Sequence, residues 1–230
     1  HGLALIEEKQ RPALGILPLG TANDFAAACL IPEDPLEALI LALKDSPLAV
    51  DLVRANERYF LNVASAGFGA AVTAETPVEL KNFLGGGAYT LVGILKVLNF
   101  TPYPVRIRAD NFEVRGDAVI GAICNGRQAG GGQVMAPGSF INDGLFDVRI
   151  VRSFPVTAMN QVITEFLNPS PDGEFVNAFQ SSWLEAFVDE PVPVNLDGEP
   201  YRSRSTRFDL LPGFIRLALP KDCPCIRPVS

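Results

Sequence analysis

The sequence predicts an α/β unit over residues 1–50, followed by a mainly antiparallel β-sandwich domain with a few helices over residues 51–230. Three observations indicate this fold class. The first 50 or so residues alternate apolar, strand-like segments with helical segments. After them come short runs rich in β-branched and aromatic residues, separated by turn residues. The chain of 230 residues is 48% hydrophobic, which is enough for a packed core.

The α/β unit contains four segments in order: "GLALIEEKQ" as the end of a helix, "ALGILPL" as a buried strand, and "DFAAACL" and "DPLEALILALKD" as two helices. Asp34 is expected to cap the last helix, with Pro35 at its first position. A chain that starts within a helix lacks the strand with which this unit would pair. We therefore expect an N-terminally truncated unit.

The loop before the first of these two helices carries Thr21, Asn23 and Asp24. These residue types accept hydrogen bonds from the free N–H groups of a first helical turn. The loop therefore predicts a capped helix start.

The second part is predicted to consist of short strands: "AVDLVRANERYFLNVASAGF" as a hairpin turning at Asn56–Glu57, then "YPVRIRADNFEVRGDAVIGAICN", "GLFDVRIV", "VPVNLDGEPYRS", "STRFDLLP" and "FIRLALP". Residues 77–99 and about 155–168 are predicted to be helical. This pattern is typical of a β-sandwich or a distorted barrel.

Three Asp-Gly pairs lie at strand junctions, where this dipeptide is a strong turn signal. We interpret Asp172 as a turn residue only. Asp143 has Asp147 nearby, and Asp197 has Glu199 nearby. On an extended chain Asp197 and Glu199 would point to the same side, as suits metal coordination or proton transfer.

The net charge of −7 argues against binding to nucleic acid or, by bulk charge, to an anionic membrane. The longest apolar stretch, residues 83–95, falls short of the roughly 20 residues that a transmembrane helix needs. Charge and hydropathy therefore favour neither a nucleic-acid-binding protein nor a membrane-spanning one.

Of the four cysteines, Cys29, Cys124, Cys223 and Cys225, only the last two lie close together in sequence. The spacing lacks the paired knuckles of a zinc site, and the one histidine is His1. The sequence thus argues against a transition-metal centre and favours a reducing, cytosolic compartment.

Residues 125–140, "NGRQAGGGQVMAPGSF", form a glycine-rich stretch. It is not a phosphate-binding Walker loop, because no Gly-Lys-Ser or Gly-Lys-Thr follows, and "GFGAAV" at Gly67 lacks the third glycine of a dinucleotide fingerprint. By itself the stretch predicts a flexible connection that is either a plain loop or a binding loop.

Taken together, "PALGILPLGTANDFA", "TAETPVELK", "NGRQAGGGQ", "INDGLFDVRI", "NLDGEP" and "LPKDCP" resemble, in order, the motifs of the bacterial diacylglycerol-kinase-like lipid kinases, in particular their YegS-type branch. The resemblance implies a nucleotide-binding α/β domain packed against a β-sandwich domain, with the active site between them. In that family a Gly-Gly-Asp-Gly-Thr loop precedes the first of these motifs, and this sequence does not contain it. The resemblance therefore implies an incomplete or shortened member, inactive by itself.

The resemblance also assigns metal-binding roles. Asp143 resembles the side-chain ligand of a magnesium ion, and the backbone carbonyls of Phe140 and Leu145 complete the protein's ligands. Asp24 and Asp51 resemble acidic residues that connect this ion through water to the nucleotide.

Thr21 resembles the threonine that contacts ATP, with Asn23 of the same motif as a second nucleotide-binding residue. Asp197 resembles the catalytic base, and Glu199 supports it. Phosphoryl transfer needs such groups: an aligned hydroxyl, cations that neutralise charge and a carboxylate that accepts the proton.

These roles predict an ATP- and Mg²⁺-dependent kinase that phosphorylates a glycerolipid such as diacylglycerol or phosphatidylglycerol. We expect a cytoplasmic protein in peripheral contact with the inner membrane face, with no nucleic-acid partner and its oligomeric state open. The apolar segment 77–99 either lines a lipid entrance or simply covers the sandwich. Two alternatives remain: a phosphotransferase like the NAD kinases, and a non-catalytic sandwich that binds lipid or a protein partner.

Overall fold

The structure is a computed structural model that describes residues 2–44, 47–67 and 102–228. The helices are η1 (Gly2–Leu5), η2 (Glu8–Gln10), α1 (Asp24–Ala28), α2 (Pro35–Lys44), η3 (Val156–Ala158) and α6 (Met159–Leu167), where η marks a 3₁₀-helix. The strands are β1 (Leu48–Ala55), β2 (Arg58–Phe60), β3 (Val63–Gly67), β4 (Tyr103–Ala109), β5 (Phe112–Cys124), β6 (Gln128–Ala129), β7 (Gln133–Val134), β8 (Phe146–Arg152), β9 (Val176–Ser181), β10 (Trp183–Leu196) and β11 (Glu199–Leu217).

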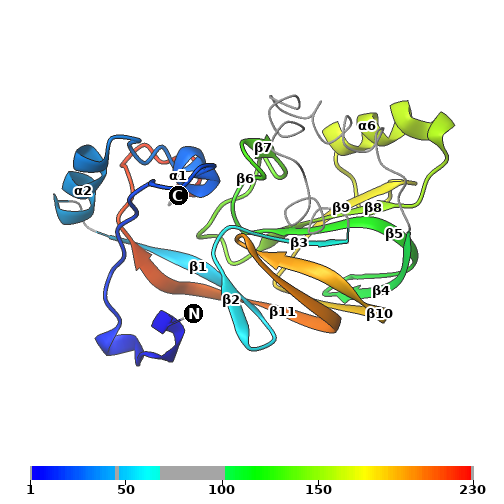
Figure 1. The fold of residues 1–230 in the computed structure, drawn as a ribbon, viewed down its shortest axis with the longest axis horizontal. Coiled ribbons are helices and arrows are strands. Elements are labelled where there is room, and N and C mark those ends of the chain that lie inside the picture. The colour runs from blue at the N-terminus through cyan, green and yellow to red at the C-terminus, as the bar shows by residue number, and fades with distance from the viewer. Residues whose placement is uncertain (1, 45–46, 68–101, 229–230) are drawn as a thin grey trace.

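Nine of these strands form one antiparallel sheet in the order β2-β1-β11-β10-β3-β5-β8-β9, with β4 pairing both β10 and β5 (Figure 1). The pairs β10 with β3, β3 with β5, β5 with β4 and β4 with β10 close a ring. The sheet therefore curls over itself, and its inner faces pack against one another. The predicted antiparallel β domain is confirmed.

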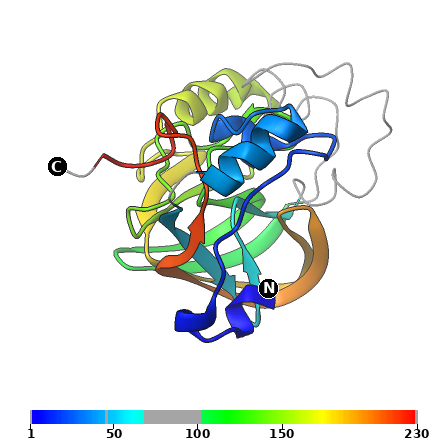
Figure 2. The same ribbon diagram turned by 90° about the vertical axis from the view of Figure 1, so that its left-hand side faces the viewer.

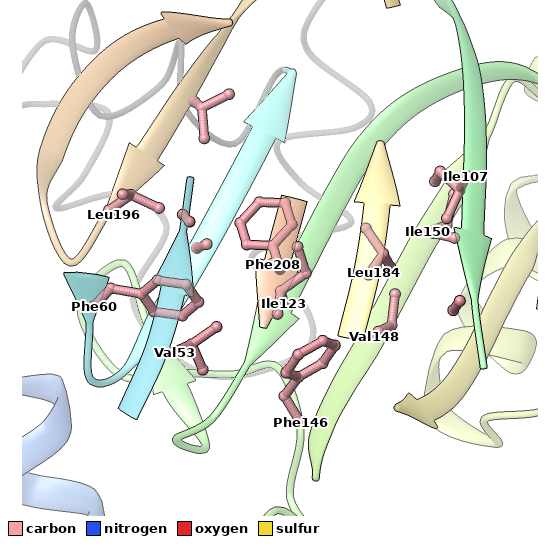
Figure 3. Close-up of a cluster of buried hydrophobic side chains, with 14 of the residues drawn as sticks. Val53, Phe60, Ile107, Ile123, Phe146, Val148, Ile150, Leu184, Leu196 and Phe208 are labelled. Atoms are coloured by element: carbon pink, nitrogen blue, oxygen red, sulfur yellow. The ribbon is translucent and has the colours of Figure 1, made fainter. Parts of the chain in front are cut away.

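The main core lies inside this curled sheet, because alternate residues of each strand point inward. Figure 3 shows side chains from strands far apart in sequence converging there, among them Phe60, Phe146, Leu184 and Phe208. Phe60 and Phe208 meet edge to face, with ring centroids 6.3 Å apart. This core fixes the register of the strands whose ends carry the candidate site.

A second core joins the N-terminal and C-terminal ends of the chain. Buried residues of α1 and α2 pack with Val50, Leu52, Ile215 and the segment from Leu219 to Cys225. In Figures 1 and 2 the two helices and the C-terminal segment lie together at one end of the molecule, beyond β1 and β11. The C-terminal segment thus packs on the N-terminal helices and not on the curled part of the sheet. At the other end, α6 packs through Met159 and Val162 on Ile120, Val151 and Val176.

Two expectations for the N-terminal segment are wrong. Residues 2–10 form the two short 3₁₀-helices, with no buried residue in either, instead of the end of an α-helix. Residues 13–19 make only one bridge, Leu14 with Leu217, and Leu19 is 72% exposed. A buried strand needs neighbours along its length, and among the described residues only Leu14 exchanges strand-like backbone hydrogen bonds, with Arg216 and Ala218, although Leu14 and Ile16 pack on the second core.

Other local predictions are confirmed. Both predicted helices form, and the Asp34 carboxylate accepts hydrogen bonds from the backbone N–H groups of Leu36 and Glu37. The hairpin turns at Asn56–Glu57, and a helix covers residues 159–167. Residues 170–175 form a turn, as Asp172 predicts. The segment 77–99 lies outside the described residues.

The last three predicted strands differ in length from the prediction. "STRFDLLP" and "FIRLALP" are not separate strands, because β11 runs continuously from Glu199 to Leu217. Pro212 and Gly213 are accommodated by a bulge, where the pairing of β11 with β1 shifts between Val50 and Leu52. The bulge lies opposite Asp51, one of the predicted site residues, and places the Gly213 N–H within hydrogen-bond distance of its carboxylate.

Candidate functional site

The candidate site lies where the N-terminal helices meet the curled sheet, around the segment from Asn125 to Leu145. Asn125 follows β5 and is fully buried. Its side-chain amide donates hydrogen bonds to the backbone carbonyls of Asp51 (3.3 Å) and Leu61 (2.7 Å). Asn125 therefore connects β1, which carries Asp51, to the loop before β3, whose backbone N–H groups bind the Asp197 carboxylate.

Asp51 is 2% exposed and sits opposite the β11 bulge. Its two carboxylate oxygens accept backbone hydrogen bonds, one from Gly213 and one from Gly144, each 2.8 Å long. Gly213 has φ +56°, a conformation that favours glycine. Burial raises the pKa of Asp51, and the N–H donors partly oppose this shift. Asp51 thus joins β11 to the turn that contains Asp143.

Asp143 lies in that turn, with a side chain only 4% exposed. One oxygen accepts a hydrogen bond from the Leu145 N–H (3.2 Å), and the other lies 3.8 Å from the Arg227 guanidinium. Burial raises the pKa of Asp143, and the nearby charges of Asp51 and Asp147 raise it further.

The residues around Asp143 fit a hard divalent cation. A buried carboxylate with two like charges nearby, and with the exposed Arg227 at 3.8 Å as its ion-pair partner, is an environment that such a cation stabilises. In the described part of the chain, the carboxylates of Asp51, Asp143 and Asp147 do not converge as one set of three close ligand atoms. Backbone carbonyls, those of Phe140 and Leu145 in the sequence-based assignment, would have to supply further ligands.

Asp24 connects the N-terminal part to the glycine-rich stretch. Its carboxylate accepts hydrogen bonds from the backbone N–H groups of Gly131 (3.0 Å) and Gly132 (2.5 Å). Both glycines have positive φ, +87° and +92°, which turns their N–H groups toward one acceptor. Asp24 therefore shapes the loop that joins β6 to β7.

The predicted capping of α1 is wrong. Asn23 has left-handed backbone angles and makes no side-chain cap. Its amide instead donates to the carbonyls of Pro18 and Gly20 and accepts from the Gly20 N–H, which stabilises the preceding loop. Thr21 is exposed in this loop. The Asp24 carboxylate binds Gly131 and Gly132, and the Asn23 amide binds Pro18 and Gly20, so neither side chain caps the N–H groups at the start of α1.

Asp197 and Gly198 form the two-residue turn between β10 and β11, with φ of +49° and +101°. The turn confirms the Asp-Gly signal. The chain is not extended there, so the argument that Asp197 and Glu199 share one side of a strand is wrong. In this turn geometry the two side chains have different surroundings.

The Asp197 carboxylate accepts hydrogen bonds from the backbone N–H groups of Leu61 (2.6 Å), Asn62 (3.0 Å) and Val63 (2.9 Å). The residue as a whole is exposed, but the surrounding chain desolvates its carboxylate and so raises the pKa of Asp197, while these N–H groups oppose the shift. Glu199 is exposed, and its carboxylate makes no hydrogen bond within the described residues.

Sequence reasoning missed Asn62 and Asn125. The backbone carbonyl of Asn62 accepts from the N–H groups of Asn125 and Gly126, and its amide donates to Gln128. The side-chain oxygens of both asparagines are buried and have no hydrogen-bond donor among the described residues. The only sequence signal was an asparagine next to the end of an apolar strand, which is also an ordinary turn signal.

A separate apolar cavity of about 60 Å³ lies inside the curled sheet, lined by residues such as Ala66, Tyr103, Val194 and Thr206. None of the predicted site residues lines it. This cavity and the clustered polar groups are therefore different places, and the chemistry points to the polar groups. No helix in the described part of the chain is long and apolar enough to cross a membrane.

Two protein-family descriptions match the chain. Residues 62–219 match the "YegS C-terminal NAD kinase beta sandwich-like domain", and residues 2–55 match the "Diacylglycerol kinase catalytic domain". The site described above lies where these two matched regions meet.

Curated relatives match almost the whole chain. A protein of Shewanella frigidimarina named "Probable lipid kinase YegS-like" is 48% identical over 226 residues, which are 97% of this chain and 73% of that protein. A protein of the same name from Chromohalobacter salexigens is 46% identical over 221 residues, 96% of this chain and 71% of that protein. The chain thus spans about three quarters of the length of these relatives.

Solved structures agree on the fold. The "Crystal structure of a putative diacylglycerol kinase from Bacillus anthracis str. Sterne" superposes on this chain with a TM-score of 0.77 at 27% identity, and the match covers 96% of this chain and 72% of that chain. The crystal structure of a diacylglycerol kinase from the same strain gives a TM-score of 0.71 at 23% identity, covering 96% and 71%, and supports the fold alone.

Proposed function

Because the chain belongs to the YegS-type family of bacterial diacylglycerol-kinase-like lipid kinases, we propose that it serves the transfer of the ATP γ-phosphate to the free hydroxyl of a glycerolipid of the diacylglycerol or phosphatidylglycerol class. Membership in this family implies the use of ATP and of a lipid acceptor. One observation carries the proposal: a continuous hydrogen-bond network holds the turn of Asp197, the buried pair Asp51 and Asp143, and the glycine-rich loop at the junction of the two matched regions.

We assign the proton-accepting role to the turn of Asp197 and Glu199. Sequence reasoning names Asp197 as the base and Glu199 as its support. Both oxygens of Asp197 already accept backbone N–H groups, so its main effect is to fix the turn on residues 61–63. Glu199 follows directly on this fixed turn with an exposed carboxylate. We therefore propose Glu199 as the group that takes the hydroxyl proton and Asp197 as the residue that positions it.

A magnesium ion would be held by the Asp143 carboxylate, with the carbonyls of Phe140 and Leu145 as further ligands. Asp51 would not bind the ion but would position its ligands, because its oxygens accept hydrogen bonds from the N–H of Gly144, next to Asp143, and from the N–H of Gly213 in the bulge. When bound, the ion supplies positive charge that neutralises the negative charge of the transferred phosphoryl group.

Nucleotide contacts are proposed at the loop of Thr21 and at the glycine-rich loop. Thr21 is exposed in a loop whose shape Asn23 maintains. Asp24 connects the start of α1 to Gly131 and Gly132. This connection couples the nucleotide-binding region to the segment that leads to Asp143.

The test is transfer of labelled γ-phosphate from Mg-ATP to a panel of glycerolipids in detergent micelles, with NAD as a further acceptor. It uses the 230-residue chain, the full-length Shewanella frigidimarina relative as a positive control, and a hybrid in which that relative supplies the part of its length outside the match. We expect the hybrid to label a glycerolipid, and Mg²⁺ removal with EDTA to stop the reaction.

Two outcomes would contradict the proposal. Labelling of NAD without labelling of any lipid would assign a phosphotransferase like the NAD kinases. Absence of transfer to any acceptor by the folded hybrid, while the chain sediments with phosphatidylglycerol vesicles, would assign a non-catalytic lipid-binding module. Sedimentation together with lipid labelling would support the expected peripheral membrane contact.

A further inference from the structure

Three of the four cysteines meet in the second core, although they lie far apart in sequence. Cys29 follows α1, whereas Cys223 and Cys225 belong to the C-terminal segment that packs on the N-terminal helices. Their sulfur atoms all lie within 4.8 Å of one another, all three residues are buried, and none forms a disulfide. In the described part of the chain this is the one set of three or more potential ligand side chains with such close ligand atoms.

A positive charge lies beside this cysteine cluster. The Arg127 guanidinium donates hydrogen bonds to the carbonyls of Ser139 and Pro224, which places its positive charge beside the cluster. Hydrogen bonds among the three thiols, together with burial, raise the pKa of Cys29 and of Cys225, and the Arg127 charge opposes the rise at Cys225. Hydrogen bonds from the neighbouring thiols of Cys225 and Cys29 lower the pKa of Cys223. The thiolate is the form of cysteine that binds metals.

We propose that Cys29, Cys223 and Cys225 form a zinc site, with a water molecule or another small ligand in the fourth position. Zinc bonds thiolate sulfur at about 2.3 Å, which places the sulfurs of a tetrahedral site about 3.8 Å apart. The sulfur atoms lie close enough for this geometry to need only small side-chain adjustments. Binding displaces the protons that the thiols still carry. Zn²⁺ with three thiolates carries one net negative charge, which Arg127 offsets.

The site would hold the C-terminal segment against α1. The first residue of α1, Asp24, in turn binds the glycine-rich loop. The metal would therefore stabilise the part of the fold from which the nucleotide contacts are proposed, while it lies outside the acidic network. Sequence spacing argued against such a site because it showed only the Cys223–Cys225 pair. Folding supplies the third ligand, Cys29.

The experiment measures zinc binding by the 230-residue chain, reduced and stripped of metal under anaerobic conditions, in competition with a chromophoric chelator. We expect one Zn²⁺ per chain, and slower alkylation of Cys29, Cys223 and Cys225 with Zn²⁺ than without it, while the alkylation rate of Cys124, buried in another cluster, stays the same. Cd²⁺ should give the ultraviolet charge-transfer absorption of metal–thiolate bonds. These readouts need no kinase activity, so they are independent of the proposed function.

Cys29→Ser, Cys223→Ser and Cys225→Ser should each weaken zinc binding by about 100-fold or more. Cys124→Ser is the matched control, because Cys124 is fully buried in a different core cluster, and it should leave zinc affinity unchanged. Circular dichroism checks that each variant folds.

The proposal would be overturned if the reduced, folded chain bound no Zn²⁺, or if Cys124→Ser weakened binding as much as the cluster variants. Isolation of the chain with a disulfide among the three cysteines that forms again in the presence of Zn²⁺ would also overturn it, in favour of a redox pair.

Discussion

Exchanging Asp197 for Asn and Glu199 for Gln should separate the stability of the β10–β11 turn from its chemistry. Asp197 accepts three backbone hydrogen bonds, and an Asn side chain keeps one acceptor oxygen and loses the charge. Hydrogen bonds to charged groups contribute about 1.5–3 kcal/mol each when shielded. Because the Asn side chain keeps one acceptor and the N–H groups of Leu61 and Asn62, which are only half-buried, can bind water, we expect a total loss of about 2 kcal/mol.

For a chain of this size, a loss of 2 kcal/mol corresponds to a fall in melting temperature of about 4–8 °C. Asn tolerates the left-handed backbone of position 197, so the substitution adds little strain. Glu199→Gln should leave the melting temperature within about 2 °C of the unsubstituted chain, because exposed side chains without contacts contribute little to stability. It should lower phosphate transfer by at least about 100-fold in the hybrid protein, through loss of the proton acceptor.

Thermal unfolding of the chain and γ-phosphate transfer by the hybrid measure the two effects. Asp172→Asn is the control, since it alters a second Asp-Gly turn in which the carboxylate accepts no hydrogen bond within the described residues. If Asp197→Asn abolished transfer at an unchanged melting temperature while Glu199→Gln stayed active, Asp197 would be the base and the assignment argued above would be refuted.

Three further results are expected. Asp24→Ala should speed amide hydrogen exchange at Gly131 and Gly132 without changing exchange in β8. Equal exchange at these two glycines in the variant and the unsubstituted chain would contradict the hydrogen bonds from them to Asp24. The backbone N–H of Ser182 lowers the pKa of Asp110, so this carboxylate stabilises the fold above about pH 4, and that contribution is lost as the pH falls through the folded-state pKa. The melting temperature of Asp110→Ala should therefore be below that of the unsubstituted chain at pH 7, and the difference should shrink as the pH falls through the folded-state pKa of Asp110; a constant difference would refute this. Phe146→Ala, at a fully buried position, should cost about 3–5 kcal/mol in urea unfolding, and a loss below about 1 kcal/mol would contradict its place in the core.

Local sequence signals predicted local structure well. The turn at Asn56–Glu57, the turn at Asp197–Gly198 and the Asp34 cap each depend on a few consecutive residues with defined backbone preferences. The order of the motifs along the chain identified the family. Where the local signal was ambiguous, as for the polar residues before α1, tertiary contacts decided how Asn23 and Asp24 are used.

The sequence by itself determined the element types, the turns and the family, because these follow from residue preferences and motifs over short stretches. Only the tertiary structure decided which distant groups meet. The β11 bulge presents Gly213 to Asp51, 162 residues away, and the packing of the C-terminal segment carries Cys223 and Cys225 to Cys29. Such contacts depend on strand register and on the closure of the whole core, and the periodicity of a single segment contains neither.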